Sequence, residues 1–184
     1  MQEFSILPTV EAPEGSRDAL GQAQKKYGFV PNLFGVLAHS PSALKAYLSL
    51  SDLFSQSNFS PVEQQVVLLT VSFENGCDYC MAAHSAASKM VGVPATVLSG
   101  LRAGTPLPDA KLEKLREFTL KVVQSRGIVS DADMQSFFSA GYSQQHVLDV
   151  ILGVAMKTLS NYTNHIAETP LDHAFQAQRW HKAA

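Results

Sequence analysis

The sequence predicts an all-α protein, and three observations support that fold class. Apolar residues recur at helical spacing along most of the chain. Serine and proline pairs of the kind that begin helices stand ahead of these runs. Strand-type alternation bounded by tight hairpin turns is missing. With 184 residues, 46% of them hydrophobic, we expect an extended arm over residues 1–15 and a single helical domain over 16–184.

The first third of the chain predicts three helices. Ser16 resembles an N-cap, and the helix behind it is expected to run over 17–27 and to stop at Gly28. A short apolar helix follows over 33–37. Ser40 and Pro41 then have the pattern of a cap and a first helical residue, and apolar residues continue at helical spacing to about Phe54.

The centre of the chain predicts two consecutive helices. Ser60-Pro61-Val62-Glu63 has the form of a capping box, so a helix should begin at Pro61 and stop at Asn75-Gly76. Another should begin near Cys77 and run to about Met90. This pair, at about 60–91, forms the core of the predicted domain.

The remaining helices are predicted from the same signals. We expect one over 94–101, a loop over 103–108, and an amphipathic helix over 110–124 that stops before Gly127. Ser130 and Ser143 should cap the next two. The last one either continues or breaks near Ser160-Asn161.

Charge and hydropathy exclude some classes of function. Fourteen basic against sixteen acidic residues give a net charge of −2, which argues against a nucleic-acid partner. The apolar runs are far short of the roughly 20 residues that cross a bilayer, so no membrane association is expected. The first residues do not resemble a signal peptide, which leaves the cytoplasm by default. Only 16% of residues are charged, which fits either burial against further copies of the chain or a bland surface.

The two cysteines, three positions apart, are the main candidates for chemistry. If a helix begins at Cys77, then Cys80 and His84 lie on the same face within two turns, at about 100° per residue. Unpaired N–H groups and the helix dipole in a first turn favour a thiolate, and a nearby imidazole can exchange protons with it. Asp78 opposes the thiolate, but it points to a different side. The triplet therefore predicts thiol–disulfide chemistry.

Zinc is the alternative interpretation of the same spacing. Two cysteines and a histidine supply three ligands, and a closed site needs a fourth. His39, Glu74 or His165 would have to provide it through the fold. Inert buried cysteines are a further alternative.

Two segments resemble a known family. The run from Val66 to His84, with Asn75-Gly76-Cys77-x-Tyr79-Cys80-x-x-x-His84, resembles the AhpD-like alkylhydroperoxidase core of the carboxymuconolactone decarboxylase family. The segment 28–41, with Val30-Pro31-Asn32 and His39-Ser40-Pro41, resembles another stretch common in such proteins. The likeness is strong over about 28–100 and weaker beyond.

The resemblance implies a fold, a reaction and partners. It implies an all-helical domain that assembles as a homo-oligomer, a trimer or a hexamer. It also implies reduction of a small peroxide by Cys80, with Cys77 as the resolving cysteine and His84 in a proton relay. Electrons would come from a lipoyl-type or other dithiol donor, without a bound organic cofactor. The family's name also leaves a decarboxylase acting on a lactone acid as an alternative.

One departure from the family pattern concerns the relay. The family commonly has a glutamate twelve residues before the first cysteine, where this chain has Gln65, which cannot accept a proton at neutral pH. Glu74 is the first candidate for a substitute base, whereas Glu63 is more simply a capping-box residue. Tyr79 stands where some relatives have a second relay histidine. We expect it to pack as an aromatic, although its phenol can donate a hydrogen bond.

Other polar residues carry weaker signals. The remaining histidines show no spacing typical of a ligand set, and they are His39, His146, His165, His173 and His181. The polar stretch Asn161–His165 follows an apolar helix. It either lines the site or an oligomer interface, or it marks a solvated helix break.

Overall fold

The computed structural model describes residues 4–182, which form nine α-helices and one short 3₁₀-helix and no strand. In chain order the helices are α1 Glu14–Tyr27, α2 Asn32–Leu37, α3 Pro41–Ser55, α4 Pro61–Glu74, α5 Asp78–Met90, α6 Ala95–Ala103, α7 Ala110–Gln124, α8 Asp131–Ser139, α9 Gln144–Ala167 and η1 His173–Gln178. The predicted all-α fold class is confirmed. No helix in this part of the chain combines the length and apolarity needed to cross a membrane.

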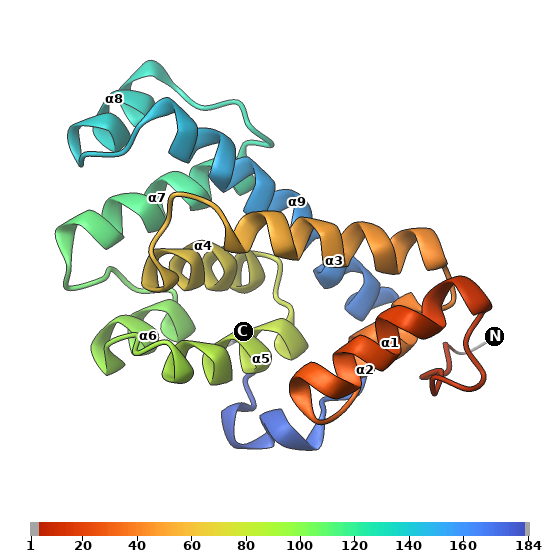
Figure 1. Cartoon of the computed structure of the whole chain (residues 1–184). Helices are drawn as coiled ribbons and strands as arrows, with labels where there is room; N and C mark the ends of the chain where they lie inside the picture. The colour runs from red at the N-terminus through yellow and green to blue at the C-terminus, as the bar shows by residue number, and fades with distance from the viewer. Residues whose placement is uncertain (1–3, 183–184) are drawn as a thin grey trace.

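Helix α4 lies at the centre of the molecule. It packs against α7 on one side and α5 on another, and α9 crosses it from the C-terminal part of the chain. Figure 1 shows α1–α3 at one end of the molecule and α6–α8 at the other, with α4, α5 and α9 between them. The side chains of α4 from Gln65 to Ser72 are all buried, as the central position of this helix requires.

Close packing of α9 on α4 depends on Gly153. A Cβ at this position would lie 2.8 Å from side-chain atoms of both Phe54 and Val67. Only a residue without a side chain lets the two helices approach this closely. The contact sets the position of the part of α9 that reaches the cysteines.

Most of the predicted helix starts are confirmed. Ser40 accepts a hydrogen bond from the Ala43 N–H, and Ser60, Ser130 and Ser143 each take part in a capping box. The last α-helix continues through Ser160-Asn161 without a break. The 3₁₀-helix over residues 173–178 has no counterpart in the sequence prediction, because short helices of this kind carry little periodic signal.

The predicted start of the first helix is wrong by three residues. The helix begins at Glu14 behind Pro13, so the N-terminal arm ends earlier than residue 15. Ser16 does not cap it, because its buried hydroxyl donates instead to the carbonyl of Ala38, 2.9 Å away. The Ser16 hydroxyl thus forms a tertiary hydrogen bond instead of a local cap. Residues 1–3 of the arm lie outside the described residues.

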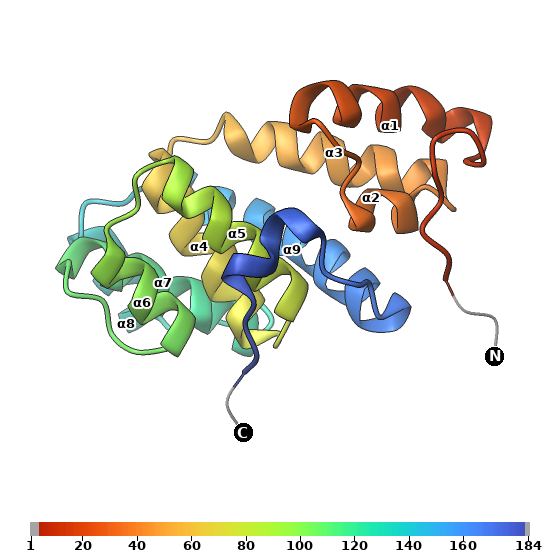
Figure 2. The same ribbon diagram turned by 90° about the horizontal axis from the view of Figure 1, so that it is seen from below.

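The C-terminal segment 168–182 crosses the start of α5, as Figure 2 shows in dark blue. Arg102 of α6 holds it through hydrogen bonds to the carbonyls of Gln178 and Arg179, 3.1 and 3.0 Å long. The Trp180 indole donates in return to the Arg102 carbonyl. We call residues 168–182 the C-terminal strap.

Candidate active site

A tight turn between α4 and α5 fixes the first cysteine. Gly76 adopts φ +66°, the left-handed conformation that favours glycine. The N–H of Cys77 then donates to the carbonyl of Ser72 over 2.9 Å, and the N–H of Gly76 donates to that of Phe73 over 3.0 Å. These two bonds form a Schellman motif, so one local turn ends α4 and sets Cys77 at the start of the next helix.

The two cysteines lie at the first turn of α5. Cys77 is the N-cap residue in an extended conformation, and Cys80 is the third residue of the helix. Both are free thiols, with exposed fractions of 1% and 2%. Cys80 thus lies where backbone N–H groups lack helical partners and the helix dipole is positive, which favours a thiolate.

One side chain of α9 contacts both sulfur atoms. The Asn164 amide donates from Nδ2 to Cys80 Sγ at 3.3 Å and to Cys77 Sγ at 3.7 Å. The hydroxyl oxygen of Ser160 lies 3.8 Å from Cys80 Sγ. The sulfurs are therefore neighbours, and Cys80 has more polar partners than Cys77.

The electrostatics distinguish the two thiols. Burial raises the pKa of Cys80, but the Cys77 thiol, the charge of Lys157 and the Ser160 hydroxyl outweigh it and hold that pKa well below its usual range. The pKa of Cys77 is raised, because it shares a proton with Cys80 and is itself buried. Cys80 is therefore the sulfur that ionises first.

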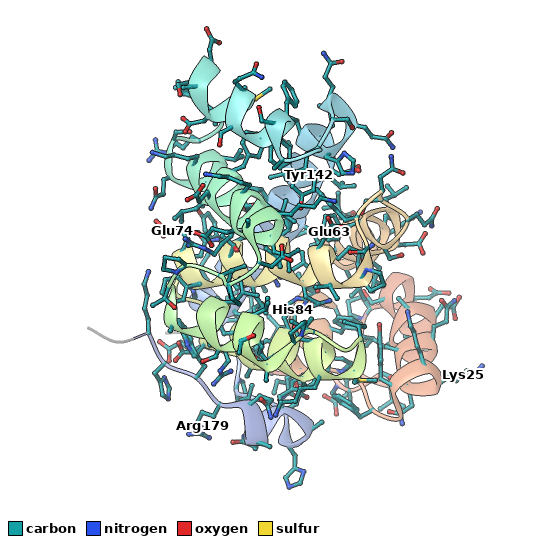
Figure 3. The ribbon with its side chains drawn as sticks, turned by 90° about the vertical axis from the view of Figure 1, so that its left-hand side faces the viewer. Lys25, Glu63, Glu74, His84, Tyr142 and Arg179 are labelled. Atoms are coloured by element: carbon teal, nitrogen blue, oxygen red, sulfur yellow. The ribbon has the colours of Figure 1, made fainter. Side chains whose placement is uncertain are left out.

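His84 lies one turn after Cys80 and faces α4. Its Nδ1 is 3.1 Å from Oε1 of Gln65, so the glutamine orients the imidazole. Burial, and then the charge of Lys157, lower the pKa of His84 well below its usual range, so the ring is neutral at neutral pH. In Figure 3 His84 faces the middle of α4, between the positions of Glu63 and Glu74.

The structure gives the two glutamates of α4 other partners. The carboxylate of Glu74 accepts a hydrogen bond from the Gln124 amide of α7, 3.3 Å away. Glu63 forms the predicted capping box with Ser60 and also accepts from the Tyr142 hydroxyl. Among the described residues, His84 forms a hydrogen bond with neither carboxylate; its partner is Gln65, which lies between the two in the helix.

Tyr79 connects the strap to α5 rather than to the thiols. Its hydroxyl donates to Asp172 over 2.5 Å and accepts from the N–H of Leu33 over 3.3 Å. Its ring packs against Phe175 of the strap. The expectation of a packed aromatic residue fits this position.

Sequence reasoning missed the buried polar stripe of α9. Lys157, Ser160, Asn161 and Asn164 follow Val150 and Gly153 on the buried face. The sequence did contain a signal for this stripe. Lys157 stands at a position where the helical repeat of apolar residues predicts a core residue. Within the stretch 161–165, Asn164 contacts both sulfurs and Asn161 is buried against Asn75, whereas Tyr162 and His165 are exposed; the alternative of a helix break is wrong.

The ligand set for the zinc alternative is not assembled. Within residues 4–182 no group of three or more His, Cys, Asp or Glu side chains is placed to hold a metal ion. His39 contacts the Ser5 carbonyl, His146 belongs to the Ser143 cap and His181 pairs with Asp78. His165 and His173 are exposed on the surface.

Comparisons with known proteins agree with this picture. The model of the carboxymuconolactone decarboxylase family matches residues 41–104, which include both cysteines and His84. The family resemblance predicted from the sequence is thereby confirmed. No curated protein matches the chain at a significant level.

Several solved structures share the fold. An AhpD-core, peroxidase-related protein from Ralstonia eutropha JMP134 is 23% identical with a TM-score of 0.84, over 94% of this chain and 93% of that one. A peroxidase-related protein from Silicibacter sp. TM1040 is 21% identical with a TM-score of 0.81, over 96% and 95%. The debrominase Bmp8, as a cysteine-to-alanine variant with 2,3,4-tribromopyrrole, is 14% identical with a TM-score of 0.76, over 97% and 96%. At these identities the likeness establishes the fold.

Proposed function

Because residues 41–104 carry the carboxymuconolactone decarboxylase family core within an AhpD-type fold, we propose that this protein is a thiol-dependent peroxidase and disulfide reductase. The observation that carries the proposal is the pair of neighbouring thiols at the start of α5, one of which has a strongly lowered pKa. A thiolate beside a second thiol is the arrangement that two-cysteine redox catalysis needs.

The reaction begins at Cys80. Its thiolate attacks one oxygen of a small peroxide, which breaks the O–O bond, leaves a sulfenic acid on Cys80 and releases the other oxygen as an alkoxide or hydroxide that takes up a proton and departs as an alcohol or water. The Cys77 thiol then condenses with that sulfenic acid, forming the Cys77–Cys80 disulfide and releasing water. A dithiol or lipoyl-type donor reduces the disulfide, exchanging first with Cys77. Neutral His84, oriented by Gln65, accepts a proton beside the thiols on its free ring nitrogen.

The test is the fate of the two thiols with peroxide. One equivalent of hydrogen peroxide should convert both free thiols into one disulfide, seen as a loss of two hydrogens in the peptide that carries both cysteines. Cys80→Ser should abolish dithiol-dependent peroxide turnover, whereas Cys77→Ser should leave a stable sulfenic acid on Cys80. Unchanged turnover in Cys80→Ser contradicts the proposal.

Two other reactions can be distinguished with the same cysteine variants and other substrates. The family's name points to a lactone decarboxylase, and the fold is shared with the debrominase Bmp8. Lactone conversion that survives replacement of both cysteines by serine would favour the decarboxylase. Bromide release from 2,3,4-tribromopyrrole that depends on Cys80, without peroxide turnover, would favour a debrominase.

We infer that the chain assembles as a homo-oligomer, a trimer or a hexamer, through α9. Apolar residues repeat along the exposed face of this helix, and Leu148, Ile151, Tyr162 and Ile166 are among them. Beside its second half lies an apolar cavity of about 640 Å³ that Leu37 and Phe4 also line. Such a continuous apolar surface is unusual on a monomer. Sedimentation of Ile166→Glu, at a residue 73% exposed, should show smaller particles than the unmodified chain.

Two free thiols that must be reduced again after each turnover suit a reducing compartment. We therefore infer a cytoplasmic location. Trapping of mixed disulfides between Cys77 and cellular dithiol proteins, in a Cys80→Ser background, would identify the donor.

A further inference from the structure

The buried face of α9 presents a row of polar side chains to the thiols. Lys157, Ser160, Asn161 and Asn164 are spaced at i, i+3, i+4 and i+7, so they share one face of the helix. Two of them contact Cys80 directly. The other two, Lys157 and Asn161, have no established role in the proposed reaction.

Lys157 is the most unusual of the four. Its exposed fraction is 0%, and within residues 4–182 its Nζ has no hydrogen-bond partner. A buried ammonium group is costly unless a negative charge lies nearby. Lys157 lies three residues before Ser160 and seven before Asn164 on the buried face of α9, and both of those side chains contact Cys80 Sγ, so Lys157 shares the face that lies against the thiols. The negative charge available to it is the thiolate of Cys80.

The amide nitrogen of Asn161 is the second buried donor without a partner. Its oxygen accepts from Asn75, which fixes the amide and leaves Nδ2 unpaired among the described residues. Two unsatisfied donors, one turn apart on the face next to Cys80, fit an oxygen that carries negative charge.

The site has no other ready source of a proton. The hydrogen-bond partners of the thiols and His84 within residues 4–182 include no carboxylate, because Gln65 occupies the relay position. A neutral His84 that donates from Nδ1 to Gln65 has no proton on its other nitrogen. Cleavage of a peroxide by a thiolate nevertheless releases a strongly basic oxygen that must be protonated.

We propose that Lys157 is a catalytic residue that holds Cys80 as a thiolate at rest and donates a proton to the oxygen that leaves the peroxide. The inference rests on the proposed function and deepens it. The thiolate of Cys80 and R–O–OH give the sulfenic acid and RO⁻. Lys157 Nζ transfers one proton to RO⁻ and becomes a neutral amine, and the product ROH departs.

The proton is restored when the disulfide is reduced. Condensation of the Cys77 thiol with the sulfenic acid releases water and leaves Lys157 neutral. Reduction by a dithiol then yields Cys77 and Cys80 as thiols and oxidises the donor to its disulfide. Transfer of the Cys80 proton to Lys157 regenerates the thiolate and the ammonium, so protons and electrons balance over one cycle.

Two reactions of Cys80 separate proton donation from the effect of charge. Alkylation by iodoacetamide releases iodide, which needs no proton, whereas hydrogen peroxide releases an oxygen that does. Both rates are measured by rapid mixing as a function of pH, in a Cys77→Ser background. At a pH where Cys80 is fully ionised, Lys157→Met should alkylate at the unmodified rate but react with peroxide about 100-fold more slowly.

Lys157→Arg provides the second variant. Arginine keeps the positive charge but does not release a proton at accessible pH. The thiolate should persist at neutral pH, seen in its ultraviolet absorbance, while the peroxide reaction slows as in Lys157→Met. The exposed Lys45→Met is the matched control and should leave both reactions unchanged.

The outcomes either support or overturn the role of Lys157. If both reactions slow equally at high pH in Lys157→Met, or if neither slows, Lys157 does not donate the proton. If Lys157→Arg reacts with peroxide at the unmodified rate, Lys157 likewise does not donate the proton. If Cys80→Ser abolishes turnover while the Lys157 variants give such results, the proposed peroxidase function still stands and only the role of Lys157 is removed. Circular dichroism spectra that match the unmodified chain confirm that the variants fold.

Discussion

At the scale of single residues, the distribution of charge around the two sulfurs decides the chemistry. Two thiols three positions apart are equivalent in the sequence, but their surroundings differ. Cys80 Sγ lies 3.3 Å from Asn164 Nδ2 and also contacts the Ser160 hydroxyl, whereas Cys77 Sγ lies 3.7 Å from the same Asn164 nitrogen and has no contact with Ser160. A low-dielectric site amplifies such differences, so one sulfur ionises and the other keeps its proton.

This asymmetry predicts the pH dependence of the peroxide reaction. The pKa of Cys80 lies well below its usual range, so the thiolate dominates at neutral pH. The second-order rate constant should be flat through neutral pH and fall only as the pH drops through that lowered pKa. An ordinary thiol loses reactivity already below a pH of about 8.5. Peptide mapping of the alkylated product should find the label on Cys80 first.

A carboxylate at position 65 should change the titration of His84. In Gln65→Glu the negative charge lies at hydrogen-bond distance from the imidazole and favours its protonated form, so the pKa of His84 should rise. Nuclear magnetic resonance of the ring protons measures the shift. Gln64→Glu is the neighbouring control, since the Gln64 amide contacts the carbonyls of Ser55 and Phe59 instead. A shift of equal size in the control would refute the assignment.

At the scale of elements, the turn between α4 and α5 positions the site. Gly76 in this turn adopts φ +66°, which glycine takes without strain, and the two hydrogen bonds of the turn hold Cys77. Any change in that turn moves the first cysteine relative to the second, which follows inside the helix.

Gly76→Ala should therefore destabilise the protein by about 1 kcal/mol, the usual cost of a left-handed conformation in an L-residue. Steric conflict is not the cause, because the nearest atom to the new Cβ is Lys182 Cδ at 3.8 Å. Gly21→Ala in α1 is the matched control. It has open space around it and ordinary helical backbone, so it should be neutral or stabilising by about 0.5–1 kcal/mol. Denaturant unfolding of both variants measures the difference.

At the scale of the whole molecule, the C-terminal strap packs against the turn that carries Cys77. Lys182 donates to the carbonyl of Glu74, and Asp172 accepts from Tyr79, so the strap contacts both sides of the turn that carries Cys77. Thiol exchange requires approach along the S–S axis. Because both sulfurs are buried, we expect a dithiol donor to need movement of the adjacent strap, whereas a small peroxide needs much less room.

Arg102→Ala should loosen the strap, because it removes the side chain that holds the carbonyls of Gln178 and Arg179. A bulky disulfide reagent should then react faster with the cysteines, and the fluorescence of Trp180, the only tryptophan, should shift to longer wavelength as its ring leaves Phe73. Lys45→Ala, at an exposed position on α3, should change neither signal. Unchanged thiol reactivity in Arg102→Ala would show that access follows another path.

The sequence by itself determined the helical fold class, most helix starts and the placing of two cysteines and a histidine at the start of one helix. Capping boxes, helical periodicity and a CxxC-x-x-x-H motif are local features, and local physics governs them. The family resemblance also marked position 65 and His84 as relay positions, and the structure places Gln65 Oε1 3.1 Å from His84 Nδ1.

Only the tertiary structure decided which groups surround the sulfurs. Glu74 is next to the cysteines in the chain but points to α7, whereas Lys157 and Asn164 are about 80 residues away and line the site. Crossing of α9 over α4 at Gly153 brings them there. Sequence spacing fixes directions along one helix, but the packing of two helices depends on shape complementarity along their whole contact, and no local pattern records it.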